Sequence, residues 1–152
     1  MLQNRGSIVV ADIPDRQAPA FYHRRVGDIT VTVLHDGYQD VAMTTVLGLP
    51  PEEAAAMLHA AFRPTPRRTA VNTFLIRSNG RTALVDTGCG TNARPTVGFL
   101  MPNLAAAGVK PEEVDTVLMT HLHPDHFGGL STLDGRWLFP NAELKLHADE
   151  RA

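Results

Sequence analysis

The sequence predicts an α/β fold in which strands alternate with helices. Segments rich in β-branched and apolar residues, such as 28–36 and 114–119, alternate with segments of good helix formers, such as 51–62. The 152 residues are enough for one domain with its own core, and the 43% hydrophobic content is ordinary for a globular protein. We expect one layered domain, preceded by a loose arm over residues 1–20.

The first predicted elements are a strand and a helix. In residues 28–36, β-branched residues alternate with other residues as in a strand, and Gly37 ends this segment. Residues 38–50 are predicted to form a loop. The helix over residues 51–62 begins with a proline at its first position and two glutamates near its positive end. A Pro-Thr-Pro stretch then stops this helix, because proline lacks the backbone N–H.

A hairpin and a second helix follow. Asn79-Gly80 joins strands predicted over residues 71–77 and 81–86, because both turn residues accept positive φ. A glycine-rich loop then leads to a helix predicted over residues 95–107. The last predicted elements are the apolar strand 114–119, a short strand over 143–147 and a helical start at 148–150.

Charge and apolar patterning argue against nucleic acid or a membrane as a partner. The 14 basic and 16 acidic residues nearly cancel and form no basic patch. No apolar run approaches the ~18 residues of a membrane span, and the run over residues 8–11 is too short for a signal peptide. We expect a cytoplasmic protein that acts on a small-molecule substrate, and we leave open an export signal upstream of this sequence.

The densest cluster of chemically active residues follows the apolar strand 114–119. Side chains alternate along an extended chain, so His121 and His123 point the same way and can hold one metal ion. Asp125 and His126 point differently and can serve a second ion, and paired ions in hydrolytic sites lie about 3.5–4 Å apart. Nitrogen and carboxylate ligands suit zinc, and also iron or manganese. The competing interpretation is a polar loop whose histidines only make structural hydrogen bonds.

Two residues are expected to hold the loop over residues 120–126 in place. Leu122 points away from the two histidines and is predicted to anchor the loop in the core. Asp86 ends the preceding parallel strand, and function gathers at this edge of such sheets. We expect Asp86 to accept a hydrogen bond from a ligand histidine and so to fix its tautomer, although capping the next turn would also explain this residue.

Other candidate residues carry weaker signals. Gly88 and Gly90 match neither phosphate-binding fingerprint, so close backbone approach near the metals is the better interpretation. Cys89 is interpreted as a small filler rather than a nucleophile, and no cofactor-binding residue is predicted apart from the metal ligands. His35 and His147 are minor candidates to line or complete the site.

The motif His121-Leu-His123-Pro-Asp125-His126, preceded by Leu84-Val-Asp86-Thr-Gly88, resembles the metallo-β-lactamase superfamily. The resemblance covers roughly residues 21–150. Within the superfamily, the sequence is similar above all to the branch of methyl parathion hydrolases and quorum-quenching lactonases. The stretches that carry this second likeness are residues 71–76 with 83–88, 103–115 and 139–143.

The resemblance implies a site and an activity. The fold would be an αββα sandwich, with His121 and His123 on the first metal and Asp125 and His126 on the second. Two zinc ions would be expected in the complete domain, with Asp125 also the candidate catalytic residue. A metal-bridging hydroxide would attack an ester, lactone or phosphotriester substrate.

Family members are usually near twice this length, so the resemblance implies that residues 21–152 are the N-terminal portion of the sandwich, with one mixed sheet and its flanking helices. We expect this domain to stop before its C-terminal half, without the third histidine, the bridging carboxylate and the last histidine. The alternative function is therefore a truncated, non-catalytic half-domain with an incomplete metal site. An uncovered apolar sheet face would also invite self-association.

Overall fold

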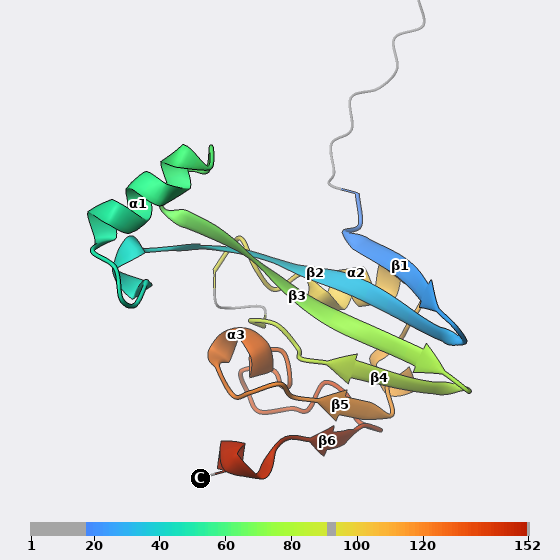
Figure 1. Cartoon of the computed structure of the whole chain (residues 1–152). Helices are drawn as coiled ribbons and strands as arrows, with labels where there is room; N and C mark the ends of the chain where they lie inside the picture. The colour runs from blue at the N-terminus through green and yellow to red at the C-terminus, as the bar shows by residue number, and fades with distance from the viewer. Residues whose placement is uncertain (1–17, 91–93, 152) are drawn as a thin grey trace, which may run out of the picture.

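The computed structural model describes residues 18–90 and 94–151, which form one mixed sheet with flanking helices (Figure 1). Its six strands lie in chain order, antiparallel from β1 to β4 and parallel from β4 to β6. The predicted α/β class with one mixed sheet is confirmed. The strands are β1 (Phe21–Val26), β2 (Ile29–Val41), β3 (Arg67–Ser78), β4 (Arg81–Val85), β5 (Thr116–Leu118) and β6 (Glu143–Lys145).

The helices are short. They are α1 (Pro51–Ala60), α2 (Leu100–Ala106), α3 (Pro124–Phe127) and the 3-10 turns η1 (Met43–Thr45), η2 (Pro111–Glu113) and η3 (Ala148–Arg151). The helix predicted from residue 51 is confirmed and has proline at its first position. The start predicted at residue 95 is wrong, because Gly98 has a φ of 91°, which no α-helix contains. No described helix has the length and hydropathy needed to cross a membrane.

β2 is longer than predicted. β1 pairs with its first half through a turn at Gly27, and the sequence analysis missed β1. The loop predicted from residue 38 is wrong at its start, because β2 passes through a bulge at Asp36 and continues to Val41. At Gly37 a Cβ atom would lie 2.0 Å from the Thr96 carbonyl oxygen, so only glycine lets the strand pass there.

The β3–β4 hairpin forms as predicted. Asn79 and Gly80 have φ values of 49° and 74°, the pair of positive angles that a two-residue type I′ turn requires. Ser78 pairs with Arg81 across the turn, and Phe74 pairs with Val85 at the far end of β4. The turn therefore sets the register that brings the end of β4, just before Asp86, to the edge where β5 also ends.

The core lies on one face of the sheet. Neighbouring strands β2 to β5 bury Leu34, Leu75, Leu84 and Val117 on this face. The α2 side chains of Leu100 and Leu104 belong to the same buried cluster. Registered partners in a sheet share a face. The whole buried apolar cluster is Leu34, Leu75, Leu84, Leu100, Leu104, Val109, Val114, Val117, Met119, Leu130 and Phe139.

The opposite face carries an apolar ladder that crosses five strands. Its registered members are Tyr22, Val33, Phe74, Val85 and Leu118. Tyr22 is 69% exposed, Phe74 40% and Leu118 42%, so solvent reaches the ladder in this chain. This is the uncovered apolar face that the sequence analysis expected.

The far ends of β2 and β3 extend beyond the sheet as an arm, which we define as residues 38–70. The arm carries η1 and α1 at its outer end (Figure 1). Arg68 makes two hydrogen bonds of 2.9 Å to Asp40, and its guanidinium lies 3.8 Å over the ring of Tyr38. These contacts tie the two strands together at the base of the arm.

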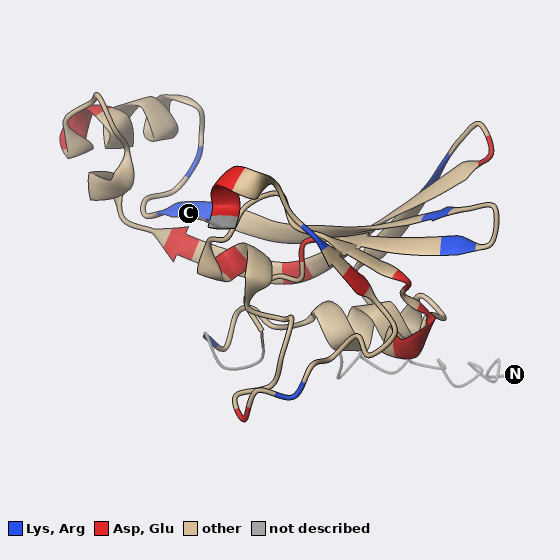
Figure 2. Ribbon diagram, turned by 90° about the horizontal axis from the view of Figure 1, so that it is seen from below, with Lys and Arg blue, Asp and Glu red and all other residues tan. Residues whose placement is uncertain are grey.

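Residues 1–17 of the predicted N-terminal arm, residues 91–93 and residue 152 lie outside the described part of the chain. Within that part, basic and acidic residues are interspersed over the strands and helices (Figure 2). Acidic residues of η3, coloured red in Figure 2, lie next to the end of the chain marked C.

Asp115 joins the beginnings of the two parallel strands β4 and β5. A hydrogen bond from Arg81 is the main cause that holds the pKa of Asp115 at about 2, and the Thr82 N–H adds to it. The folded-state pKa is thus below the ordinary value of 3.8, so this stabilisation is present above pH 3.8 and is lost as the pH falls towards about 2.

We expect Asp115→Asn to remove this acid-sensitive part of the stability. The free energy of unfolding, measured by urea denaturation between about pH 4 and pH 2, should fall less steeply in the variant than in the wild type. Equal slopes in the two proteins would contradict the assignment.

Candidate metal centre

The histidine loop, residues 120–126, lies at the edge of the sheet where β4 and β5 both end (Figure 1). β5 delivers the chain to this edge, and Pro124 then starts α3 at its first position, where a missing N–H costs nothing. The His126 N–H donates to the His123 carbonyl oxygen at 2.9 Å. The sequence thus turns sharply just after its first two histidines.

Asp86 holds this loop from β4. It accepts hydrogen bonds of 2.8 Å from the Thr120 N–H and from His126 Nδ1, and the Thr120 hydroxyl is also 2.8 Å away. The residue is buried and has a φ of 59°, an uncommon angle that aspartate tolerates better than most residues. Because a carboxylate can only accept, the proton of the neutral His126 ring is on Nδ1, which leaves Nε2 as a free acceptor.

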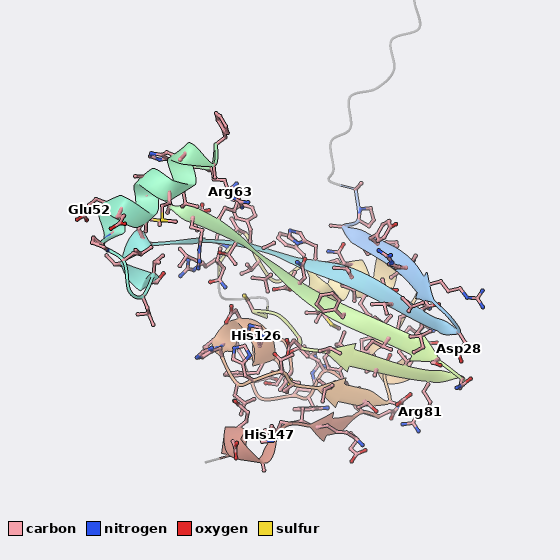
Figure 3. The ribbon with its side chains drawn as sticks, viewed as in Figure 1. Asp28, Glu52, Arg63, Arg81, His126 and His147 are labelled. Atoms are coloured by element: carbon pink, nitrogen blue, oxygen red, sulfur yellow. The ribbon has the colours of Figure 1, made fainter. Side chains whose placement is uncertain are left out.

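The three imidazole rings of the loop lie together. The centroids of His121 and His123 are 4.6 Å apart with the rings edge to face, and those of His121 and His126 are 3.9 Å apart. His126 Nε2 lies 3.9 Å from Asp125 Oδ2 (His126 is labelled in Figure 3). Gln39 on β2 donates to the same carboxylate oxygen at 3.4 Å.

The donor chemistry of this cluster fits zinc, which is bound in proteins by imidazole nitrogens and carboxylate oxygens. The hydrogen bond from His126 to Asp86 is also the contact that commonly orients a metal-binding histidine. In residues 18–90 and 94–151, however, no three His, Cys, Asp or Glu side chains are arranged to hold one ion. The described part of the chain therefore supplies suitable ligands without assembling a closed coordination shell.

Leu122 does not anchor the loop in the core, and that prediction was wrong. Its side chain is 37% exposed. The backbone is held instead, because the Leu122 N–H donates to Glu150 Oε2 at 2.8 Å. No local pattern around residue 122 could have indicated a partner 28 residues further along the chain.

The glycine-rich loop after β4 packs backbone to backbone against the turn that follows α3. A Cβ atom at Gly90 would lie 2.3 Å from the Gly128 carbonyl oxygen, and one at Gly129 would lie 2.1 Å from that of Thr87. The Thr87 N–H donates to the His126 carbonyl oxygen at 2.7 Å. The expected close backbone approach beside the histidine loop is confirmed.

Asp36, at the β2 bulge, is a structural residue that the sequence analysis did not single out. Its buried carboxylate accepts the N–H groups of Cys89 and Leu100 at 2.9 Å and that of Gly98 at 3.3 Å. Burial raises the pKa of Asp36, and these hydrogen bonds oppose the shift. The carboxylate thereby joins the glycine-rich loop to the start of α2.

Cys89 is not set up as a nucleophile. Burial is the main cause that raises the pKa of its thiol to about 12, and the Asp36 carboxylate adds to the shift. A thiol in that state is not ionised at neutral pH and is therefore unreactive. The interpretation as a small filler agrees with this environment.

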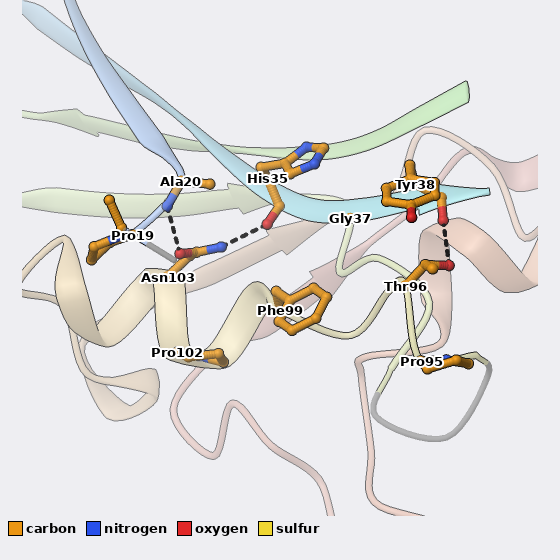
Figure 4. Close-up of a pocket in the computed structure, with 11 residues that line it drawn as sticks. Pro19, Ala20, His35, Gly37, Tyr38, Pro95, Thr96, Phe99, Pro102 and Asn103 are labelled. Carbon is orange, nitrogen blue, oxygen red and sulfur yellow. Dashed lines mark hydrogen bonds between the residues drawn. The ribbon is translucent and has the colours of Figure 1, made fainter. Parts of the chain in front are cut away.

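A pocket of about 630 Å³ lies between β2, α2 and residues 18–20 (Figure 4). His35 lines it, with Nδ1 3.0 Å from Asn72 Oδ1. Asn103 bridges its wall by accepting the Ala20 N–H at 2.9 Å and donating to the His35 carbonyl oxygen at 2.7 Å. The other minor candidate, His147, is exposed and lies 3.4 Å from Asp149.

Comparisons with known proteins agree with this geometry. A family model described as the metallo-beta-lactamase superfamily matches residues 66–151. The N-acyl homoserine lactonase AiiB of Agrobacterium fabrum is 33% identical over 100 residues, which are 54% of this chain and 34% of the lactonase.

Two solved structures resemble the whole sheet. The hydrolase AbOPH, described as in the beta lactamase superfamily, matches 89% of this chain with a TM-score of 0.81 and 33% identity. AidC, a dizinc quorum-quenching lactonase in complex with a product, matches 83% with a TM-score of 0.77 and 28% identity. This chain spans 47% and 44% of those two proteins, and the expected likeness to the lactonase branch is confirmed.

Proposed function

Because the chain belongs to the metallo-β-lactamase superfamily, we propose that it carries the first part of the active centre of a metal-dependent hydrolase. Ester, lactone and phosphotriester groups are the substrate classes we favour. Support comes from the likeness to the lactonase AiiB and to the hydrolase AbOPH, each 33% identical where it matches.

The four candidate ligands of the histidine loop each have a role in this proposal. His121 and His123 would hold one ion, and Asp125 and His126 a second, with zinc preferred over iron or manganese. Bound ions would supply hydroxide at neutral pH and polarise the substrate oxygen. Asp86 keeps the His126 proton on Nδ1, and Gln39 steadies the Asp125 carboxylate from β2.

One observation carries the proposal. The hydrogen bond of 2.8 Å between His126 Nδ1 and Asp86 leaves Nε2 free, and that atom lies 3.9 Å from Asp125 Oδ2. The buried Asp86 carboxylate thus fixes the His126 tautomer so that Nε2 points towards the Asp125 carboxylate. The arrangement suits two ligands that converge on one ion.

The test is zinc binding and hydrolysis by the chain and by His126→Ala. We expect zinc to bind to the wild type, measured by competition with a chelating dye, and to bind at least about tenfold more weakly to the variant. A panel of one lactone and one phosphotriester tests turnover. His59→Ala on α1 is the matched control, because it removes an exposed histidine from the arm. Wild-type and His126→Ala proteins with equal zinc affinity would contradict the proposal.

The second candidate is a non-catalytic half-domain with an incomplete metal site. It is favoured by the lack of any three-ligand cluster among the described residues. Weak zinc binding without turnover would support it, and two tightly bound ions per chain would exclude it.

Self-association through the apolar ladder is a further part of this proposal. A second copy could cover Tyr22, Phe74 and Leu118, which are exposed across the open face of the sheet. Light scattering after size exclusion gives the mass directly. A monomer at all concentrations would rule out pairing.

A further inference from the structure

The C-terminal turn η3 places a carboxylate beside the tip of the histidine loop. Glu150 is half-buried there, and its Oε2 lies 2.8 Å from the Leu122 backbone nitrogen. Leu122 is the residue between His121 and His123. The contact therefore acts on the peptide units that set where these two imidazoles point.

This contact is a charge-assisted hydrogen bond at an exposed position. A hydrogen bond from a backbone N–H to a carboxylate is roughly twice as strong as one between neutral groups. The Leu122 side chain is exposed, so side-chain packing does not hold the tip of the loop. Asp86 holds the loop at Thr120, two residues earlier, and the His123 carbonyl oxygen is held by the His126 N–H on the other side. The Glu150 contact lies between these two points, at the Leu122 N–H.

Glu150 is itself held in place by its own segment. Its N–H donates to the His147 carbonyl oxygen at 3.2 Å, and Leu146 packs against the buried cluster just after β6. β6 pairs in parallel with β5, the strand that leads into the histidine loop. The pairing of β5 with β6 thus places the two segments that follow these strands, and that carry Leu122 and Glu150, next to each other (Figure 1).

We propose that Glu150 is a positioning residue, whose carboxylate holds the Leu122 N–H so that His121 and His123 stay on the same side of the loop. Metal binding by these two histidines rests on the proposed function. The hold on the loop does not, because it is present in the chain without metal. Glu150 acts through the backbone and does not contact the ion.

The experiment compares wild type with Glu150→Ala, Glu150→Gln and Asp149→Ala by NMR on the full chain. In Glu150→Ala, the Leu122 amide should exchange with solvent at least about tenfold faster than in the wild type, because its charged acceptor is gone. Glu150→Gln keeps an acceptor oxygen and should restore part of the protection. Asp149→Ala removes an equal charge from the neighbouring exposed residue and should change nothing.

Zinc titration of the same proteins gives the second measurement. The zinc affinity of Glu150→Ala should fall about tenfold, with partial recovery in Glu150→Gln. The imidazole 15N chemical shifts of His121 and His123 should change at a lower zinc concentration in the wild type than in Glu150→Ala.

Two results would overturn the inference: unchanged Leu122 exchange in Glu150→Ala, or a zinc-dependent shift of the Glu150 carboxylate carbon that marks it as a ligand. Failure of the proposed function has a different signature. In that case the wild type does not bind zinc, while Leu122 exchange still responds to Glu150→Ala.

Discussion

Asp86→Asn is expected to leave the chain folded and to weaken zinc binding by about 10- to 100-fold. Asparagine accepts the φ of 59° at this position, and its carbonyl oxygen can still accept the Thr120 N–H. Its NH2 group would then face His126 Nδ1, which must become the acceptor. The ring proton would move to Nε2, the nitrogen that is free to bind a metal in the wild type.

Chelator competition measures the zinc affinity, and thermal unfolding checks the fold. Asp115→Asn makes the same chemical change at the opposite ends of β4 and β5, so it serves as the matched control and should bind zinc like the wild type. Wild-type zinc affinity in Asp86→Asn would contradict the assigned tautomer of His126.

Asp36→Ala is expected to lower the free energy of unfolding by about 3 kcal/mol or more. The substitution leaves the N–H groups of Cys89, Gly98 and Leu100 without their acceptor, and each unsatisfied buried group costs about 1–3 kcal/mol. A loss of this size is a large part of the total stability of a small domain. Urea denaturation followed by circular dichroism measures it.

The stability lost in Asp36→Ala should depend on pH. Burial raises the folded-state pKa of Asp36 above its ordinary value of 3.8, so the folded chain binds more protons than the unfolded chain in the window just above pH 3.8. The stability that Asp36 contributes therefore falls as the pH rises through this window. The difference between wild type and Asp36→Ala should be larger near pH 4 than near pH 7, and the reverse order would contradict the shift.

The sequence predicted those elements whose causes are local. Asn79-Gly80 specified the β3–β4 turn, and a proline with two glutamates specified the start of α1. The spacing of the histidine loop also indicated metal chemistry, because four candidate ligands within six residues are hard to explain by packing. These signals lie within one turn or one strand of the residues they determine.

The parts that could not be predicted depend on distant partners. β1 is mostly polar and exposed, and it forms a strand because β2 offers it an open edge. The bulge at Asp36 places its carboxylate against backbone N–H groups more than 50 residues away, and no local pattern indicates those partners. No local pattern marks Glu150 as a partner of Leu122, because the pairing of β6 with β5 is what brings their two segments together.

The contact between the glycine-rich loop and the turn after α3 limits which parts of this protein can tolerate substitutions. Gly90 and Gly129 leave no room for a side chain, so libraries that vary these two loops should yield mostly misfolded proteins. The arm tolerates more, because Leu47 and Phe62 on it are almost fully exposed and α1 packs mainly on η1. Residues 43–62 are therefore the part of the chain where we expect substitutions to disturb the histidine loop least.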